Sequence, residues 1–209
     1  MMTCLASGLS MRLALHIANG AAGIVVSKVG TYPIHRSELL DLWHSYKHSV
    51  QSKPLYSKEE MKQLITQWQN KGETVVFTNG CFDILHRGHI TYLQEAAQLG
   101  DHLIIGLNSD ASVRRLKGET RPIVREEDRA ALLSALRCID GVVLFEEDTP
   151  AELLAYLRPN TLVKGGDYKI EDIIGRESVE HVEVLSFKEG YSTSDIIGKI
   201  ATMAKEGKL

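Results

Sequence analysis

From Thr74 onward, short apolar runs alternate with amphipathic segments. Runs rich in β-branched residues predict strands, and apolar residues at helical spacing predict helices. Strands are expected at 74–80, 102–110, 141–147, 161–167 and 182–187. Helices are expected at 88–100, 125–139, 149–158 (capped by Thr149, with Pro150 first) and from about Thr193, with a short helical stretch before the last strand. Continuous apolar strands separated by such helices predict an α/β fold, a doubly wound parallel sheet covered on both faces.

In such a sheet the ligand lies beyond the carboxyl ends of the strands, at the point where the strand order reverses. The loops that should carry the chemistry therefore follow Phe77, Asn108, Phe145, Val163 and Phe187.

The first fifty-six residues follow a different pattern. Apolar residues at 9–22 have helical spacing, and the β-branched run at 24–30 predicts a strand-like tail. A short helix opened by Ser37 and two prolines, Pro33 and Pro54, indicate a linker.

A boundary is expected near Ser57. Ser57 and Glu60 form a capping-box pattern for a helix that runs to about Lys71, with Gly72 as its stop. We therefore expect two parts, residues 1–56 and residues 57–209.

Composition limits the classes of function. The 209 residues are 44% hydrophobic and 24% charged, with a formal net charge of -3, which argues against a surface built to bind nucleic acid or an anionic membrane. Arg12, His16 and Asn19 interrupt the apolar N-terminus and no cationic region precedes it, so neither a signal peptide nor a membrane span is expected. The three cysteines form no CxxC pair, which favours a reducing, cytoplasmic location over a disulfide framework or a zinc ribbon.

The strongest chemical signal is in "FTNGCFDILHRGHITYL", residues 77–93. His86 and His89 lie three residues apart and so share one helical face, and Gly88 lets a ligand approach the backbone. A helix that begins near Arg87 would point its free amides at the same place, which suits a polyphosphate. The chain contains neither GxxxxGK[ST] nor, at this first turn, GxGxxG.

Two alternatives stay open for these histidines. They could bind a metal together with Cys81 or Asp83, although no HExxH or third histidine at ligand spacing supports this, and no protein metal site is expected. They could also only cap the helix or fill the core. Asp83 could orient a histidine, contact ribose or stabilise the local turn.

Further candidates follow the later strands. The stretch 114–129 is strongly basic, which is also typical of a solvated helix. Lys164 follows an apolar strand, Gly165 and Gly166 leave room for a ligand, and Asp167 could hold Lys164 or a sugar. Hydroxyls precede the last helix, where they could bind phosphate or cap the helix: Ser192, Thr193 and Ser194.

These segments resemble a known family. "GCFDILHRGHITYLQEAAQLGDHLIIGLNSDASVRRLKG" is similar to the cytidylyltransferase-like nucleotidyltransferase superfamily, whose signature is HxGH. "LKGETRPI", "FEEDTPAELL", "LVKGGDY" and "EGYSTSDII" resemble the adenylyltransferase domain of bifunctional D-glycero-β-D-manno-heptose-7-phosphate kinases/heptose-1-phosphate adenylyltransferases, over residues 73–200. The N-terminal residues are similar to the last helix and tail of the ribokinase-like kinase domain, whose GAGD motif would lie before Met1, so kinase activity is not expected.

The resemblance implies a Rossmann-like nucleotidyltransferase fold and transfer of AMP from ATP to a sugar 1-phosphate. It implies catalytic roles for His86 and His89 on the triphosphate, for Lys117 in a mobile basic loop, and for Arg129 reaching phosphate. Arg121, in the "RPI" turn of the basic stretch, is a further candidate. The implied nucleotide-binding residues are Asn79, Gly80, Cys81, Phe82, Asp83, Gly88, Asn108, Asp110, Lys164, Gly165, Asp167, Ser192, Thr193 and Ser194. ATP as substrate, magnesium (Mg2+) bridging its phosphates, and a homodimer are expected.

One motif departs from the superfamily, which often has ISSTxxR where this chain reads "YSTSDII". Ile197 stands in the place of the arginine, so the resemblance puts triphosphate clamping on Lys117 and Arg129, with Lys199 as a further candidate. Two alternatives remain: cytidylyl transfer to glycerol 3-phosphate or a similar alcohol phosphate, and a non-catalytic nucleotide-binding module.

Overall fold

The computed structural model describes residues 11–28, 30–42, 55–186 and 192–208. The chain divides into two compact units, residues 1–52 and residues 53–209. Phe187, one of the expected loop positions, lies outside the described residues.

Within the first unit, the described residues form two helical segments. Helix α2 (Met11–Val26) buries Leu13, Ala14 and Ile17, and the second helix covers residues 36–42, where a short helix was expected. The prediction of a strand-like tail from 24 is wrong, because α2 continues through Gly23 to Val26. β-Branched residues disfavour a helix only weakly, so a helix that has already formed can continue through them.

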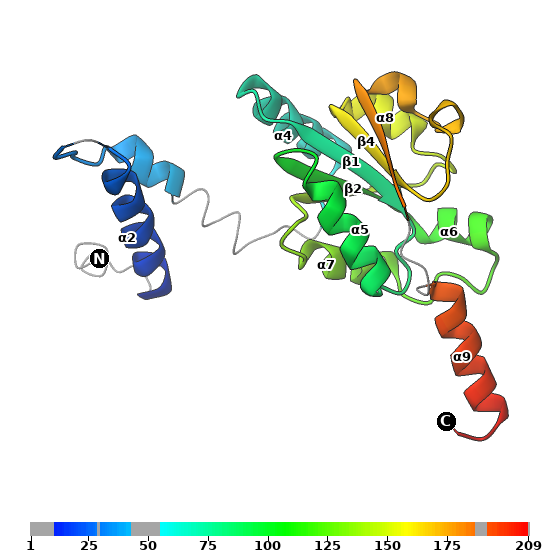
Figure 1. The fold of residues 1–209 in the computed structure, drawn as a ribbon. Coiled ribbons are helices and arrows are strands. Elements are labelled where there is room, and N and C mark those ends of the chain that lie inside the picture. Colours follow the sequence, from blue (N-terminus) through cyan, green and yellow to red (C-terminus); the bar gives the residue numbers. More distant parts are fainter. Residues whose placement is uncertain (1–10, 29, 43–54, 187–191, 209) are drawn as a thin grey trace. The chain divides into compact units, whose positions relative to one another are not determined.

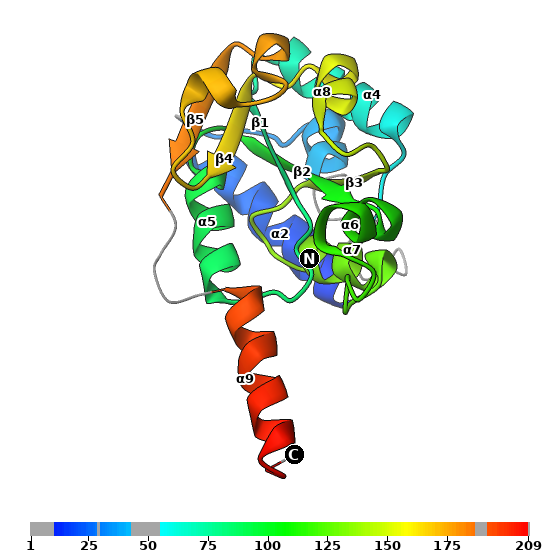
Figure 2. The ribbon, with the colours of Figure 1, turned by 90° about the vertical axis from the view of Figure 1, so that its right-hand side faces the viewer.

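The second unit is built on a parallel sheet of five strands in the order β3-β2-β1-β4-β5 (Figure 1 shows the sheet, and the strands are labelled in Figure 2). The strands are β1 (Val75–Gly80), β2 (His102–Asn108), β3 (Gly141–Phe145), β4 (Thr161–Gly165) and β5 (His181–Leu185). The order reverses at β1, since β2 lies on one side of it and β4 on the other. The predicted doubly wound α/β sheet is confirmed.

Helices cover both faces of this sheet. One core contains residues of α5 (Arg87–Ala97) and α7 (Glu126–Ser134), and the other contains residues of α4 (Lys58–Asn70) and α8 (Ala151–Leu157). The remaining elements are α6 (Asp110–Lys117), the 3-10 turns η1 (Ile170–Asp172) and η2 (Arg176–Ser178), and α9 (Thr193–Lys205). Figure 2 shows α6 beyond the carboxyl end of β3.

Helix α4 begins as its sequence predicts. Ser57 Oγ accepts from the Glu60 amide at 3.1 Å, Glu60 Oε2 accepts from the Ser57 amide at 2.9 Å, and Gly72 follows the helix with φ of 80°. The helix buries Met61 and Ile65 completely against the sheet.

Two local predictions differ from the structure. Residues 110–117 form helix α6, so Lys117 is the last residue of a helix and does not lie in a loop. Ser109 caps α6, since its side chain accepts from the Ser112 amide. Helix α8 begins one residue later than expected, with Pro150 and not Thr149 as its N-cap residue, and no side chain caps it. Among the described residues, no helix has both the length and the apolar character needed to cross a membrane.

Candidate active site

The HRGH motif lies at the amino end of α5, directly after β1. His86 is the N-cap residue of α5, and its Nδ1 accepts from the His89 amide at 3.4 Å. The two imidazoles stack with centroids 3.8 Å apart and planes at 19°. His86 therefore caps the helix and also holds the ring of His89 beside its free amides.

His89 is held in its neutral form. Burial and the neighbouring His86 lower its pKa to about 4, and the Ile84 carbonyl opposes this only in part. The ring of Phe82 meets that of His89 edge to face, with centroids 5.3 Å apart. At neutral pH, His89 therefore has one N–H to donate and carries no charge.

Phe82 shapes the loop between β1 and α5. Its φ is 45°, in the left-handed region, and its side chain is buried. A Cβ added at Gly80 would come within 3.0 Å of the Phe82 ring. Glycine at 80 thus gives room to the ring that packs on His89.

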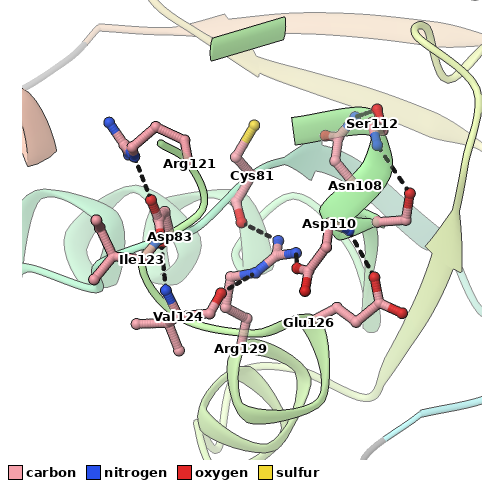
Figure 3. A network of polar contacts seen from close by, with 11 residues as sticks. Cys81, Asp83, Asn108, Asp110, Ser112, Arg121, Ile123, Val124, Glu126 and Arg129 are labelled. Carbon is pink, nitrogen blue, oxygen red and sulfur yellow. Dashed lines mark hydrogen bonds and ion pairs between the residues drawn. The ribbon is translucent and has the colours of Figure 1, made fainter. Parts of the chain in front are cut away.

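Asp83 ties this loop to the segment before α7 (Figure 3). Its carboxylate accepts from Arg121 Nε at 2.6 Å and from the amides of Ile123 and Val124 at 2.8 and 2.9 Å. The Asp83 side chain is only 1% exposed. All three contacts go to the protein, so Asp83 positions a loop.

Arg129 connects three segments at the carboxyl edge of the sheet (Figure 3). Its side chain is fully enclosed, and it donates to Val124 O at 3.0 Å, to Cys81 O at 2.5 Å and to Asp110 Oδ1 at 2.7 Å. Each of its three guanidinium nitrogens already has a protein acceptor. In this structure Arg129 faces the loops and not an open site.

The end of β2 is held by a second chain of polar contacts. Asn108 Nδ2 donates to Ser112 Oγ at 3.0 Å, and Ser112 Oγ donates to Glu147 O at 3.1 Å. Glu126 Oε2 accepts from the Asp110 amide at 2.6 Å. Sequence reasoning missed Ser112 and Glu126, although Ser109 followed by Ser112 is the spacing of a helix cap.

Cations gather around Cys81. Burial raises the pKa of the Cys81 thiol, and the charges of Lys117, Arg129 and Arg121 act against that rise. Arg121 is paired with Asp83, whereas Lys117 is exposed at the end of α6. The structure therefore brings Lys117 near the loop that leads to the histidines.

A lysine lies across the switch point between β1 and β4. Lys164 Nζ donates to the side-chain oxygen of Asn79, and burial lowers the pKa of Lys164 to about 8. Asp167, expected as a possible partner, is exposed, and Lys164 is bonded to Asn79 instead. Gly166 has φ of 123°, a conformation that glycine adopts easily.

The hydroxyls before α9 act first as a cap. Ser192 Oγ accepts from the Ser194 amide at 3.1 Å. Thr193 Oγ1 donates to Ile84 O at 3.5 Å, which links this helix start to the β1–α5 loop. Ile197 and Lys199 lie further along α9.

In the described part of the chain, no three histidine, cysteine, aspartate or glutamate side chains gather as a metal-binding group. Of the three carboxylates labelled in Figure 3, Asp83 and Asp110 are paired with arginines, and Glu126 accepts from the Asp110 amide.

A parallel sheet whose order reverses between β1 and β4, with neutral and charged hydrogen-bond donors around that point, defines a nucleotide-binding α/β domain. The sequence model of the Cytidylyltransferase-like family matches residues 77–199, and the chain belongs to this family.

Curated relatives extend the match beyond these residues. "Bifunctional protein HldE" of Citrifermentans bemidjiense is 51% identical over 201 residues, and that of Campylobacter jejuni subsp. jejuni is 50% identical over 197 residues. Each match covers 94% of this chain and 41% of the relative. The HldE of Wolinella succinogenes is 47% identical, over 94% of this chain and 42% of the relative. The chain thus spans about two fifths of the length of these relatives. A solved structure titled "Crystal structure of the lipopolysaccharide core biosynthesis protein from Thermoplasma volcanium GSS1" is 32% identical over 58% of this chain and all of that chain, with a TM-score of 0.47.

Proposed function

We propose that this chain transfers AMP from ATP to D-glycero-β-D-manno-heptose 1-phosphate, giving ADP-heptose and pyrophosphate for lipopolysaccharide core biosynthesis. Membership of the Cytidylyltransferase-like family and identities of 47 to 51% with HldE proteins support this. The observation that carries it is the stacked His86–His89 pair at the free amides of α5, with His89 neutral.

The reaction needs positioning more than it needs a base. A phosphate oxygen of the sugar 1-phosphate is already anionic and attacks the α-phosphorus of ATP, while the bond from that phosphorus to the bridging oxygen breaks and pyrophosphate leaves with the electron pair. The imidazole N–H groups of His86 and His89 and the amides at the start of α5 would hold the departing phosphates.

Charge for the triphosphate comes from Lys117, which is exposed and lies near the Cys81 loop. In this proposal Arg121 and Arg129 do not contact the substrate. Both donate hydrogen bonds to protein acceptors, which fixes the loops around Cys81 and Val124. The other predicted nucleotide-binding residues lie at the carboxyl ends of β1, β2 and β4, in the segments directly after β1 and β4, and at the starts of α5, α6 and α9.

Magnesium is expected to accompany ATP. The described residues supply no cluster of three acidic, histidine or cysteine ligands to hold it, so phosphate oxygens would be its main ligands. The ion would offset phosphate charge there.

Residues 1–56 are proposed to correspond to the end of a kinase domain and its linker. Matches that cover 94% of the chain must include most of these residues, which supports the proposal. A cytoplasmic location and a homodimer belong to the same proposal. Light scattering on the purified chain tests the dimer, and a mass equal to one chain at working concentration would refute it.

Pyrophosphate release tests the function. The purified chain with magnesium is given ATP or CTP, and heptose 1-phosphate or glycerol 3-phosphate, in the four combinations. We expect turnover with ATP and heptose 1-phosphate. Preference for CTP with glycerol 3-phosphate would assign the chain to cytidylyl transfer, and a folded, nucleotide-binding sample without turnover would favour a binding module.

A further inference from the structure

Lys164 is a partly buried cation with a neutral partner. Its ammonium donates to the side-chain oxygen of Asn79, and no carboxylate of the described residues lies within ion-pair distance of it. Burial lowers its pKa, and no charged neighbour among the described residues contributes to that shift. A buried ammonium without an anion is costly, so this site favours an anionic ligand.

The two arginines that hold the neighbouring loops differ in this respect. Arg121 is paired with Asp83 and Arg129 with Asp110, at 2.6 and 2.7 Å. Their charges are therefore already balanced by the protein. Lys164 retains its charge for a ligand, and Asn79 holds the ammonium at the switch point, where such sheets bind ligands.

Lys164 and the two histidines lie toward opposite faces of the sheet. Side chains alternate along a strand, so Asn79 lies on the same face as Phe77, and Lys164 on the same face as Leu162. Phe77 and Leu162 belong to the core formed with α4 and α8. A Cβ at Gly106 would approach both Phe77 and Asn79, which places these two side chains together.

The opposite face carries α5. Thr78 Oγ1 lies 2.6 Å from Tyr92 Oη, which also donates to Val163 O at 3.2 Å. Tyr92 follows His89 by one helical turn, so the histidines approach the switch point from this side. The strand ends of β1 and β4 therefore have imidazoles on one side and an ammonium on the other.

We propose that Lys164, positioned by Asn79, binds the phosphate of the acceptor, while the histidines bind the phosphates that leave. In an in-line displacement the attacking and departing oxygens are on opposite sides of the phosphorus, which matches cationic and imidazole donors on opposite faces. This inference rests on the proposed function, which supplies the acceptor phosphomonoester.

The test separates the two substrates kinetically. Lys164→Met removes the cation. Asn79→Asp changes the size of the side chain little, but it places a carboxylate beside the Lys164 ammonium. We expect each to raise the KM for the sugar 1-phosphate at least tenfold and to change the KM for ATP less than threefold. Lys62→Met is the matched control, because Lys62 is also a partly buried lysine, and it donates to a single neutral oxygen, Leu157 O, at 2.9 Å.

A binding measurement keeps this inference separate from the proposed function. Calorimetric titration with heptose 1-phosphate, and separately with inorganic phosphate, is done in the presence of a non-hydrolysable ATP analogue. We expect the parent and Lys62→Met to bind, and Lys164→Met and Asn79→Asp to bind at least tenfold more weakly. The assignment would be overturned if all four proteins bound equally or if the parent did not bind, whether or not the parent turns over. It would also be overturned if the variants raised only the KM for ATP. Lack of turnover in a parent that binds as expected would count against the proposed function alone.

Discussion

Arg129 and Asp110 form an ion pair of 2.7 Å in which the guanidinium is fully enclosed and the carboxylate is 19% exposed. The same guanidinium bonds the carbonyls of Cys81 and Val124, so one side chain joins the end of β1, the start of α6 and the segment before α7. Arg129 therefore stabilises the three segments that surround the candidate site.

Replacing Arg129 with methionine should destabilise the protein. Removing one partner of a buried, hydrogen-bonded pair leaves the other charge and two carbonyls unsatisfied, at a cost of about 3 kcal/mol in the free energy of unfolding. Urea denaturation of the parent and the variant measures this. Arg125→Met, which changes an exposed neighbour, is the control, and equal stability of all three proteins would contradict the role given to Arg129.

Asp83→Asn should loosen the segment 118–125. The amide keeps the shape of the carboxylate, but it weakens the contact with Arg121 and turns a donor toward one of the amides of Ile123 and Val124. Hydrogen exchange followed by mass spectrometry should show faster exchange in this segment and no change in α8. Asp128→Asn, an exposed change on α7, should leave both unchanged. Unaltered protection of 118–125 in Asp83→Asn would mean that Asp83 does not anchor the segment.

His89→Ala should lower turnover by about 10²- to 10³-fold, since it removes one donor aimed at developing charge. Exposed His181 at the start of β5 supplies the control, His181→Ala, which should turn over like the parent. Thermal melts of both variants check folding. Equal rates in His89→Ala and parent would remove His89 from the mechanism.

The charge state of His89 can be observed directly. Because burial and His86 hold its pKa at about 4, the neutral ring is present above that pH and is lost only as the pH falls through it. In NMR spectra of the ligand-free protein, the His89 ring signals should therefore stay in place between pH 5.5 and 8. A midpoint inside that range would show a ring that is charged in part at physiological pH.

His102 should make the protein more stable at low pH than at high pH. Its ring stacks on Trp68 at 4.0 Å and lies 3.1 Å from Glu73 and 3.3 Å from Asp140. Burial alone would lower its pKa, but the two carboxylates outweigh it and raise the pKa above the ordinary value. The resulting stabilisation is complete below the unfolded pKa of about 6.5 and is lost as the pH rises through the higher folded value.

His102→Asn measures this contribution. The difference in unfolding free energy between parent and variant should be larger at pH 6 than at pH 9, because only the protonated ring gains from the carboxylates. Glu73→Gln with Asp140→Asn should remove the pH dependence while keeping the histidine. A difference that is the same at both pH values would refute a charged His102.

The sheet and α4 were predictable because their signals are local. β-Branched runs mark β1 and β2, and Ser57 with Glu60 marks the start of α4 within four residues. The HRGH motif likewise identified the start of α5, since its spacing and its glycine lie in one turn. The last residues of α2, 24–26, were missed because their β-branched side chains favour strands, and helix α6 was missed because the predicted strand ran on to Asp110, past the Ser109 cap.

The supporting contacts of the site could not be read in this way. Arg129 meets Asp110 across 19 positions, and Arg121 meets Asp83 across 38. An arginine in a charged stretch gives no sign of being enclosed, since most arginines are exposed. The Lys164–Asn79 contact depends on β4 lying beside β1, which follows from topology and not from either local segment.

Helix α4 precedes the family match, which begins at residue 77, yet it is inseparable from the sheet. A Cβ at Gly141 would come within 2.2 Å of the terminal carbon of Met61. Tyr56 forms an isolated β-bridge with Val143, in which the Tyr56 amide donates a hydrogen bond to Val142 O at 2.9 Å. A fragment cut at the family boundary would leave the apolar surface beneath Met61 and Ile65 open to water and prone to aggregation. We therefore expect the shortest fragment that folds on its own to start before Tyr56, and expression trials should place the cut there.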